Sequence, residues 1–182
     1  RTHVGRVRRL GAWLDGCIID LNFAYAAMLA HAGEARPQRV ADALVPPSMR
    51  EFLEGGESAL RRAREALESF EEGRGPNDET LAYAPGEVRL LAPLPDPASV
   101  RDFYAFEAHV KKGFEKRAEP MPAEWYELPV YYRGGHQNIL GTDEDVPWPP
   151  FTEKFDYELE LAAVIGRRGR DIPATRAREY IA

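Results

Sequence analysis

Three carboxylates occupy every second position of the segment Phe155 to Leu161, at Asp156, Glu158 and Glu160. Side chains two residues apart along a β-strand project from the same face, roughly 6.5–7 Å from one another. Carboxylates at this spacing repel one another unless water or a cation lies between them. The row of acids is therefore either a solvated face or part of a binding site for a divalent cation.

Apolar residues fill the positions between these acids, and the run Ala162 to Ile165 that follows is entirely apolar. Strict alternation over seven residues predicts a β-strand with one apolar face and one acidic face. A strand that continues into an unbroken apolar run is typical of a chain that enters a core. Acids that approach a core need a partner, so the pattern leaves a solvated edge strand and a cation site as open alternatives.

Bulk composition narrows the function classes. The 182 residues are 44% hydrophobic and 30% charged, with a net charge of −6, which allows one large domain or two small ones. Basic residues are scattered and not interleaved with aromatic ones, so we expect no nucleic-acid partner. No apolar run approaches the ~18 residues of a membrane span, so we expect no membrane partner. The single cysteine, Cys17, excludes a disulfide framework and favours a cytoplasmic location.

Local signals predict a small α+β domain over residues 1–87. The turn signal at residues 15–16 joins two strand-like runs, and Asp20 is a suitable N-cap for the helix that follows. A second domain is predicted over residues 88–182. It opens with a strand over residues 88–91 and a proline-rich stretch, which marks the boundary between the two domains. Helices are predicted over residues 20–31, 38–45 and 57–72, with a short one that begins at Ser48.

Periodic apolar residues predict another helix over residues 99–117. Asp102 and His109 are seven positions apart, so on such a helix they share a face, ~10 Å apart along the axis. Residues 118–150 are rich in proline and predict irregular extended chain, with a short strand over residues 129–132.

Three spaced segments share an order and spacing: Asp102-Phe103-Tyr104 with His109, Leu128-Pro129-Val130 with Tyr132, and Asp156, Glu158 and Glu160 with Leu161. Together they resemble the fumarylacetoacetate hydrolase family, and the resemblance covers residues 88–182 while remaining loose over residues 1–87. It implies an α+β protein with a mostly β catalytic domain, a mixed sheet rolled into a sandwich or barrel, behind the small N-terminal domain.

The resemblance assigns metal-binding roles to Asp102, Glu158 and Glu160. All three supply oxygen ligands, which suit Mg²⁺, or Mn²⁺ or Ca²⁺, better than zinc. The family has one more metal-binding aspartate and a lysine, in a segment that would follow Ala182. We therefore expect this chain to stop before the last metal ligand.

The resemblance also implies that His109 activates a water molecule and that Tyr104 and Tyr132 line the substrate pocket. Judged by residue type alone, a lone histidine on a helix is more often an ordinary polar residue. His136, beside two glycines, is a second candidate base. Glu107 is expected to be a solvated helix residue.

The implied activity is that of a divalent-metal-dependent hydrolase that cleaves a C–C bond of a diketo acid of the fumarylacetoacetate or acylpyruvate type. The cation would hold the substrate and stabilise the enolate that cleavage leaves, while an imidazole supplies the base. The close alternative is decarboxylation, isomerisation or hydration of a 2-oxo acid by the same chemistry. A non-catalytic cation-binding structural domain is the alternative from another class. Relatives of this type are commonly homodimers, so a second copy is the expected partner.

Overall fold

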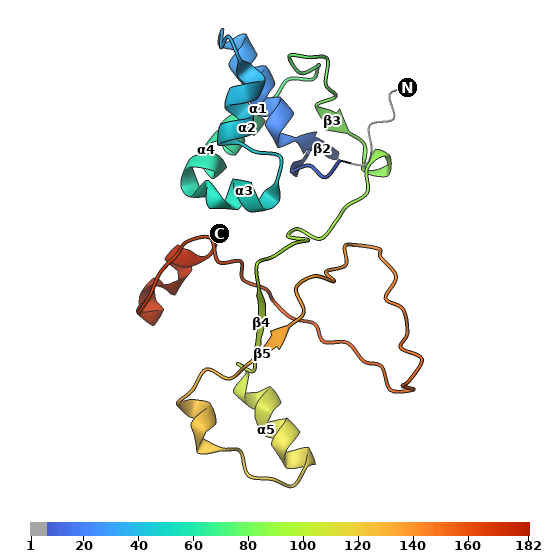
Figure 1. Ribbon diagram of the computed structural model, residues 1–182, viewed down its shortest axis with the longest axis vertical. Helices are drawn as coiled ribbons and strands as arrows, with labels where there is room; N and C mark the ends of the chain where they lie inside the picture. Colours follow the sequence, from blue (N-terminus) through green and yellow to red (C-terminus); the bar gives the residue numbers. More distant parts are fainter. Residues whose placement is uncertain (1–6) are drawn as a thin grey trace.

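The computed structural model describes residues 7–182 and is a mixed α+β protein with two small antiparallel sheets (Figure 1). The first sheet has the strand order β1-β2-β3 and lies with four helices in the part of the chain before residue 88. The second sheet pairs β4 with β5. The sandwich or barrel implied by the family resemblance stays a prediction, as does the domain boundary at residue 88.

The predicted hairpin at the start of the chain is confirmed. Strands β1 (Gly11–Leu14) and β2 (Cys17–Asp20) pair in antiparallel register, and β3 (Ala82–Tyr83) pairs with the other edge of β2. Asp15 and Gly16 both take positive φ angles, which is the backbone conformation that a two-residue hairpin turn requires.

Helix α1 (Leu21–His31) begins as predicted, because the Asp20 carboxylate accepts a hydrogen bond from the Phe23 amide at 3.0 Å. Gly33, with φ of +84°, follows the end of the helix. The Arg9 guanidinium pairs with the same buried carboxylate and also donates to Asn22. This network fixes the junction between the hairpin and the helices.

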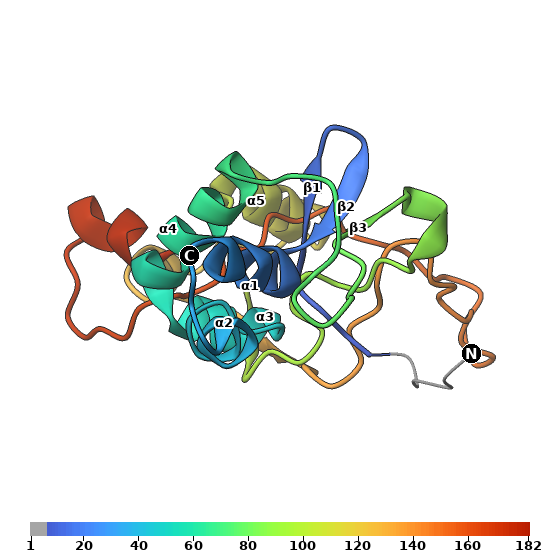
Figure 2. The ribbon, with the colours of Figure 1, turned by 90° about the horizontal axis from the view of Figure 1, so that it is seen from above.

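Three further helices complete the N-terminal core: α2 (Pro37–Leu44), α3 (Met49–Glu54) and α4 (Gly56–Glu68). Helix α1 packs against α2 and α4, and Figure 2 shows α1 and α2 side by side. The Ser48 hydroxyl caps α3, as its position in the sequence predicted. None of the helices among residues 7–182 has the length and hydropathy of a membrane span. The buried core residues include Leu10, Leu21, Tyr25, Ala26, Ala41, Val45, Phe52, Ala59, Ala63 and Ala66.

The single helix predicted over residues 99–117 is wrong. Residues Val100–Phe103 form strand β4, and helix α5 starts only at Glu107 and ends at Lys116. Strand β4 pairs with β5 (Tyr131–Gly134), which includes part of the strand predicted over residues 129–132. The ladder joins residues about thirty positions apart. A local period of apolar residues gives no information about so distant a partner strand.

Two predicted strands are also absent from the described residues. Residues 88–91 and 155–161 are extended but belong to neither sheet. The alternation over 155–161 is present in the sequence, yet Leu159 and Leu161 are 95% and 98% exposed. A strand needs a hydrogen-bonded neighbour as well as an alternating pattern, and residues 7–182 provide none for this segment. Short 3₁₀ turns occur at Pro85–Glu87 (η1), Ala123–Tyr126 (η2) and Ala174–Tyr180 (η3).

Candidate metal centre

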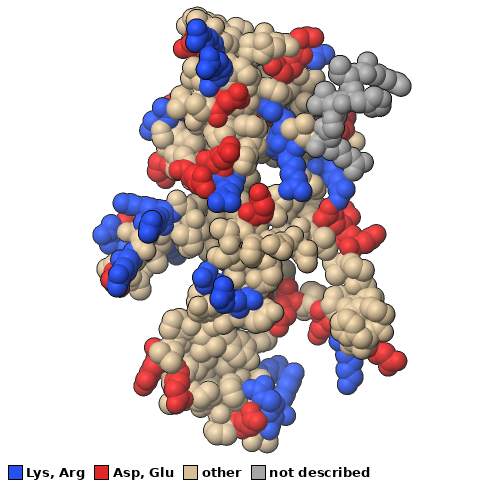
Figure 3. Space-filling view, viewed as in Figure 1, with Lys and Arg blue, Asp and Glu red and all other residues tan. Residues whose placement is uncertain are grey.

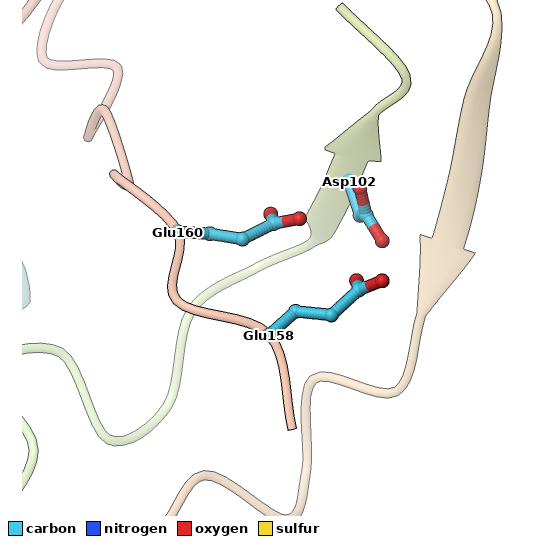
Figure 4. Close-up of side chains that lie close together, drawn as sticks. All are labelled: Asp102, Glu158 and Glu160. Atoms are coloured by element: carbon cyan, nitrogen blue, oxygen red, sulfur yellow. The ribbon is translucent and has the colours of Figure 1, made fainter. Parts of the chain in front are cut away.

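Asp102, Glu158 and Glu160 converge in the structure. Each offers one carboxylate oxygen, and these three oxygens lie within 4.8 Å of one another. Figure 4 shows the three side chains reaching toward a shared space, one from β4 and two from the extended segment beside it. The structure thus brings together the three acids to which the family resemblance assigned metal-binding roles, and their role as ligands stays a prediction.

Two different parts of the chain position these acids. Asp102 is half-buried on β4, where strand alternation puts it on the same face as Val100. Glu158 and Glu160 are exposed and are two positions apart on an extended backbone, so both can project to the same side. Two of the three acids predicted to share a face, Glu158 and Glu160, therefore lie together, although the hydrogen-bonded strand is absent.

The donor set fits a hard divalent cation. Three carboxylates so close together carry like charges, and none of them makes an ion pair with Lys or Arg among residues 7–182. The group contains oxygen donors only, which Mg²⁺, Mn²⁺ and Ca²⁺ prefer. A cation held by Asp102, Glu158 and Glu160 would remove the repulsion and leave positions open for water or substrate oxygens.

The two predicted pocket tyrosines lie close to Asp102 along the second sheet. Tyr132 is the residue of β5 directly opposite Asp102 on β4, and it is 69% exposed. Tyr104 immediately follows β4, and its amide donates to the Val130 carbonyl at 3.2 Å. Tyr132 is therefore accessible to a small molecule, and Tyr104 is 36% exposed.

His109 lies in the first turn of α5, not on a helix shared with Asp102. Its ring meets the Tyr104 ring edge-to-face, with the centroids 5.9 Å apart. Its amide donates to the Phe106 carbonyl at 3.0 Å, which holds it at the start of the helix. Strand β4, the turn 104–106 and α5 thus connect Asp102 to His109 in place of one continuous helix.

Two residues that sequence reasoning missed contact this turn. The Trp125 indole donates to the Tyr104 carbonyl at 2.9 Å, and the Tyr126 hydroxyl donates to the Glu107 carboxylate at 2.6 Å. Glu107 is an exposed helix residue, as predicted, and it also pairs with Lys111 at 2.6 Å. The adjacent Trp125-Tyr126 pair, just before Leu128, was the only signal in the sequence.

Hydrogen bonding shifts the pKa of each member of this group. The bonds from Lys111 and then Tyr126 lower the pKa of the Glu107 carboxyl, and the same carboxylate raises the pKa of both donors. Near neutral pH the acid is therefore charged and both partners carry the protons that they donate.

The remaining candidates take no part in the cluster. Asp156 accepts a hydrogen bond from the adjacent Tyr157 amide at 2.9 Å, which is a local contact. His136 is half-buried in the chain that follows β5. Acidic and basic side chains are interspersed over the face of the molecule shown in Figure 3.

Comparison with known proteins identifies the family of this chain. Residues 98–182 match the model of the fumarylacetoacetate (FAA) hydrolase C-terminal domain. Over 175 residues, the chain is 31% identical to oxaloacetate tautomerase fahd2, mitochondrial, of Xenopus laevis, covering 95% of this chain and 44% of that protein. It is 32% identical over 142 residues to the human oxaloacetate tautomerase FAHD2A, mitochondrial, covering 78% and 40%.

A bacterial protein with the same kind of name is similar to the chain at a comparable level of identity. Oxaloacetate tautomerase YisK of Bacillus subtilis is 31% identical over 143 residues, covering 75% of this chain and 44% of that protein. The chain therefore spans less than half the length of each of these relatives. The matched region contains Asp102, His109, Tyr132, Glu158 and Glu160. The chain belongs to the fumarylacetoacetate hydrolase family.

Proposed function

We propose that this protein is a divalent-cation-dependent enzyme that interconverts the keto and enol forms of oxaloacetate or a closely related 2-oxo acid. The single observation that carries the proposal is the convergence of Asp102, Glu158 and Glu160, in a chain that is 31–32% identical to proteins named oxaloacetate tautomerases. The relatives' names supply the reaction, and the carboxylate cluster supplies a centre at which it can occur.

The roles of the side chains follow from their chemistry. Asp102, Glu158 and Glu160 would hold the cation, Mg²⁺ in the first instance. A bound cation supplies a Lewis acid that polarises the 2-oxo group and makes the neighbouring C–H more acidic. The phenols of Tyr104 and Tyr132 would hydrogen-bond the carboxylate and carbonyl oxygens of the substrate.

Tautomerisation moves one proton from carbon to oxygen, or in reverse. His109 is the residue that we assign to it: the imidazole takes the proton from the methylene carbon next to the carbonyl, and the oxygen of the resulting enolate then takes a proton back from the imidazolium, which gives the enol. Imidazole suits this step because it can accept and return a proton near neutral pH. Its edge contact with Tyr104 places it beside a residue that is itself two positions from Asp102.

Hydrolysis of an acylpyruvate is the second candidate, and the same contact of His109 with Tyr104 favours it. In this reaction the histidine takes a proton from water, the resulting hydroxide attacks the acyl carbon, and the C–C bond breaks to give a carboxylic acid and a 2-oxo acid. Decarboxylation and hydration of 2-oxo acids belong to the same group of alternatives. A cation-binding domain without catalytic activity is the remaining alternative.

The test follows the enol absorbance of oxaloacetate and, separately, of a short acylpyruvate. Acceleration of oxaloacetate tautomerisation that needs Mg²⁺ and is lost in Glu160→Gln supports the tautomerase. Loss of acylpyruvate absorbance with release of two acids supports the hydrolase instead. The matched control is Glu153→Gln, an exposed acid of the same region outside the cluster. Cation binding without either reaction would favour the non-catalytic alternative.

Two broader expectations are proposals of the same kind. A homodimer is proposed from the family resemblance, and the sedimentation coefficient of the purified protein tests it. A cytoplasmic location is proposed from the single cysteine, whereas the frog and human relatives carry the word mitochondrial in their names. Fractionation of cells that express the protein separates the two locations.

A further inference from the structure

The 3₁₀ turn η2 lies against the short segment that connects the candidate metal centre to His109. Its last two residues both bond to this segment: the Trp125 indole donates to the Tyr104 carbonyl at 2.9 Å, and the Tyr126 hydroxyl donates to Glu107 at 2.6 Å. The two aromatic rings meet edge-to-face, with their centroids 5.1 Å apart, so each ring packs on the other. One pair of adjacent residues thus holds both ends of the segment 104–107.

This segment is where the backbone changes direction between Asp102 and His109. Strand β4 ends at Phe103 and α5 begins at Glu107. Asp102 itself is fixed by the ladder with β5, and the bond from the Tyr104 amide to the Val130 carbonyl continues the pairing by one residue, but no such pairing extends into α5. The orientation of α5, and with it the place of the His109 ring, therefore depends on what holds the segment 104–107.

Helix α5 has little else to fix it at this end. No side chain caps its N-terminus, and Val110 is its buried residue among those the structure describes. A ten-residue helix is marginal in water without tertiary support. Glu107, in its first turn, accepts from Tyr126 and pairs with Lys111 one turn later, so the bond from Tyr126 reaches directly into the helix.

Backbone hydrogen bonds within η2 and just after it stabilise this turn. The Trp125 amide donates to the Pro122 carbonyl at 3.2 Å, and the Leu128 amide donates to the Glu124 carbonyl at 2.9 Å. Strand β5 begins three residues after Leu128 and pairs with β4. The chain therefore runs from the anchored turn directly back to the strand opposite Asp102.

We propose that Trp125 and Tyr126 are positioning residues that fix His109 and Tyr104 relative to Asp102. The proposal rests on the proposed function in one respect, namely that His109 transfers the proton. Neither residue needs to touch the substrate; both act through the segment 104–107. Misplacing a catalytic group by about 1 Å can cost about a hundredfold in rate, so loosening this segment should be visible in turnover.

The experiment removes each hydrogen-bond donor and keeps each ring, with Trp125→Phe and Tyr126→Phe. Trp148→Phe is the matched control for the first, because the Trp148 indole also donates to a backbone carbonyl, that of Thr152 at 2.8 Å, in another loop. Tyr83→Phe, on β3, is the control for the second.

Turnover should show a specific pattern. The kcat with the accepted 2-oxo acid should fall about tenfold in Trp125→Phe and Tyr126→Phe, while KM and the Kd for Mg²⁺ change less than about twofold. Both control variants should keep the wild-type kcat within about twofold. Unchanged kcat in the two variants, or a fall accompanied by an equal loss of Mg²⁺ affinity, would overturn the proposal.

Amide hydrogen exchange decides the question even if the wild-type protein turns over no 2-oxo acid, which would refute the proposed function alone. Both variants should raise the exchange rate of residues 104–112 about tenfold, without a change in α1 to α4. The same exchange rates as wild type over residues 104–112 would show that η2 does not hold the segment, and would refute the positioning role.

Discussion

Asp102 and Tyr132 are directly opposite each other on the antiparallel strands β4 and β5. Residues opposite each other in such a pair have side chains on the same face of the sheet, about 4.5–5.5 Å apart at Cβ. A carboxylate proposed to bind a cation and a phenol proposed to bind substrate are therefore set side by side by backbone pairing. The geometry does not depend on a flexible loop.

Removing the Tyr132 hydroxyl should weaken substrate binding and spare the cation. We expect Tyr132→Phe to raise KM for the 2-oxo acid about tenfold, the value of one hydrogen bond to a charged group, with an unchanged Kd for Mg²⁺. Tyr131→Phe is the control, since Tyr131 projects from the other face and packs on Phe103 at 5.3 Å. Equal effects of the two substitutions on KM would contradict this assignment.

Replacing either clustered glutamate should weaken cation binding, whereas replacing the neighbouring Asp156 should not. We expect Glu158→Gln and Glu160→Gln each to weaken Mn²⁺ or Mg²⁺ binding by at least about tenfold, measured by calorimetry. Asp156→Asn should leave affinity unchanged, because Asp156 bonds to the adjacent amide and is not in the cluster. A comparable loss of cation affinity in Asp156→Asn would show that the cation site includes Asp156.

Cation binding should also order the segment that carries the two glutamates. Among the described residues, no backbone hydrogen bond joins residues 155–163 to another part of the chain. Ligation would tie residues 158 and 160 to β4, so we expect Mg²⁺ to slow amide exchange over 155–163 and a chelator to reverse it. Exchange in α1 to α4 should not respond. Identical exchange with and without Mg²⁺ would argue against ligation by this segment.

The hydrogen bond from Tyr126 on η2 to Glu107 on α5 should form over a defined pH range. The pKa of Glu107 lies below its ordinary value of 4.5, so its stabilising effect is present above that pH and is lost as pH falls through the lowered pKa. Tyr126 and Lys111 have raised pKa values, so their contribution persists up to at least their ordinary values of 10.0 and 10.5. Tyr126→Phe should therefore alter exchange of residues 104–112 equally from pH 5 to 9. The difference from wild type, compared at each pH, should shrink well below pH 4.5.

Stability of the N-terminal core should depend on Asn22. This residue is completely buried, and its amide donates to the Val45 carbonyl at 2.9 Å and to Asp42 at 3.2 Å. Asn22→Ala would leave the carbonyl of the buried Val45 without this donor, at a cost of about 1–3 kcal/mol in the free energy of unfolding. Thermal unfolding measures this, with the exposed Asn138→Ala as control. The Kd for Mg²⁺ should not change.

Local signals in the sequence predicted the N-terminal elements because their causes are local. Asp15 and Gly16 define a turn between adjacent strands, and Asp20 and Ser48 cap the helices that directly follow them. The same reasoning failed at β4, where the partner strand lies about thirty residues away and overrides an apolar helical period. Helix propensity is a weak prior against such tertiary pairing.

The candidate site was predictable only in part for the same reason. Alternation placed Glu158 and Glu160 on one side of the chain, and the family resemblance added Asp102. Nothing in the residue pattern joined Trp125 to Tyr104 or Tyr126 to Glu107, because these contacts bridge about twenty positions through side chains alone. Contacts of this kind become visible only when the chain is folded.

The distance along the chain between the acids has a consequence for the order of folding. Residues 103–157 separate Asp102 from Glu158, and closing a loop of that length costs roughly 3–4 kcal/mol of chain entropy, apart from a constant term. The hairpin and α1 to α4 join neighbours in sequence, so they can form early and quickly. The cluster of carboxylates should therefore assemble last. A chelator added during refolding should leave the early kinetic phase unchanged and prevent only the final one.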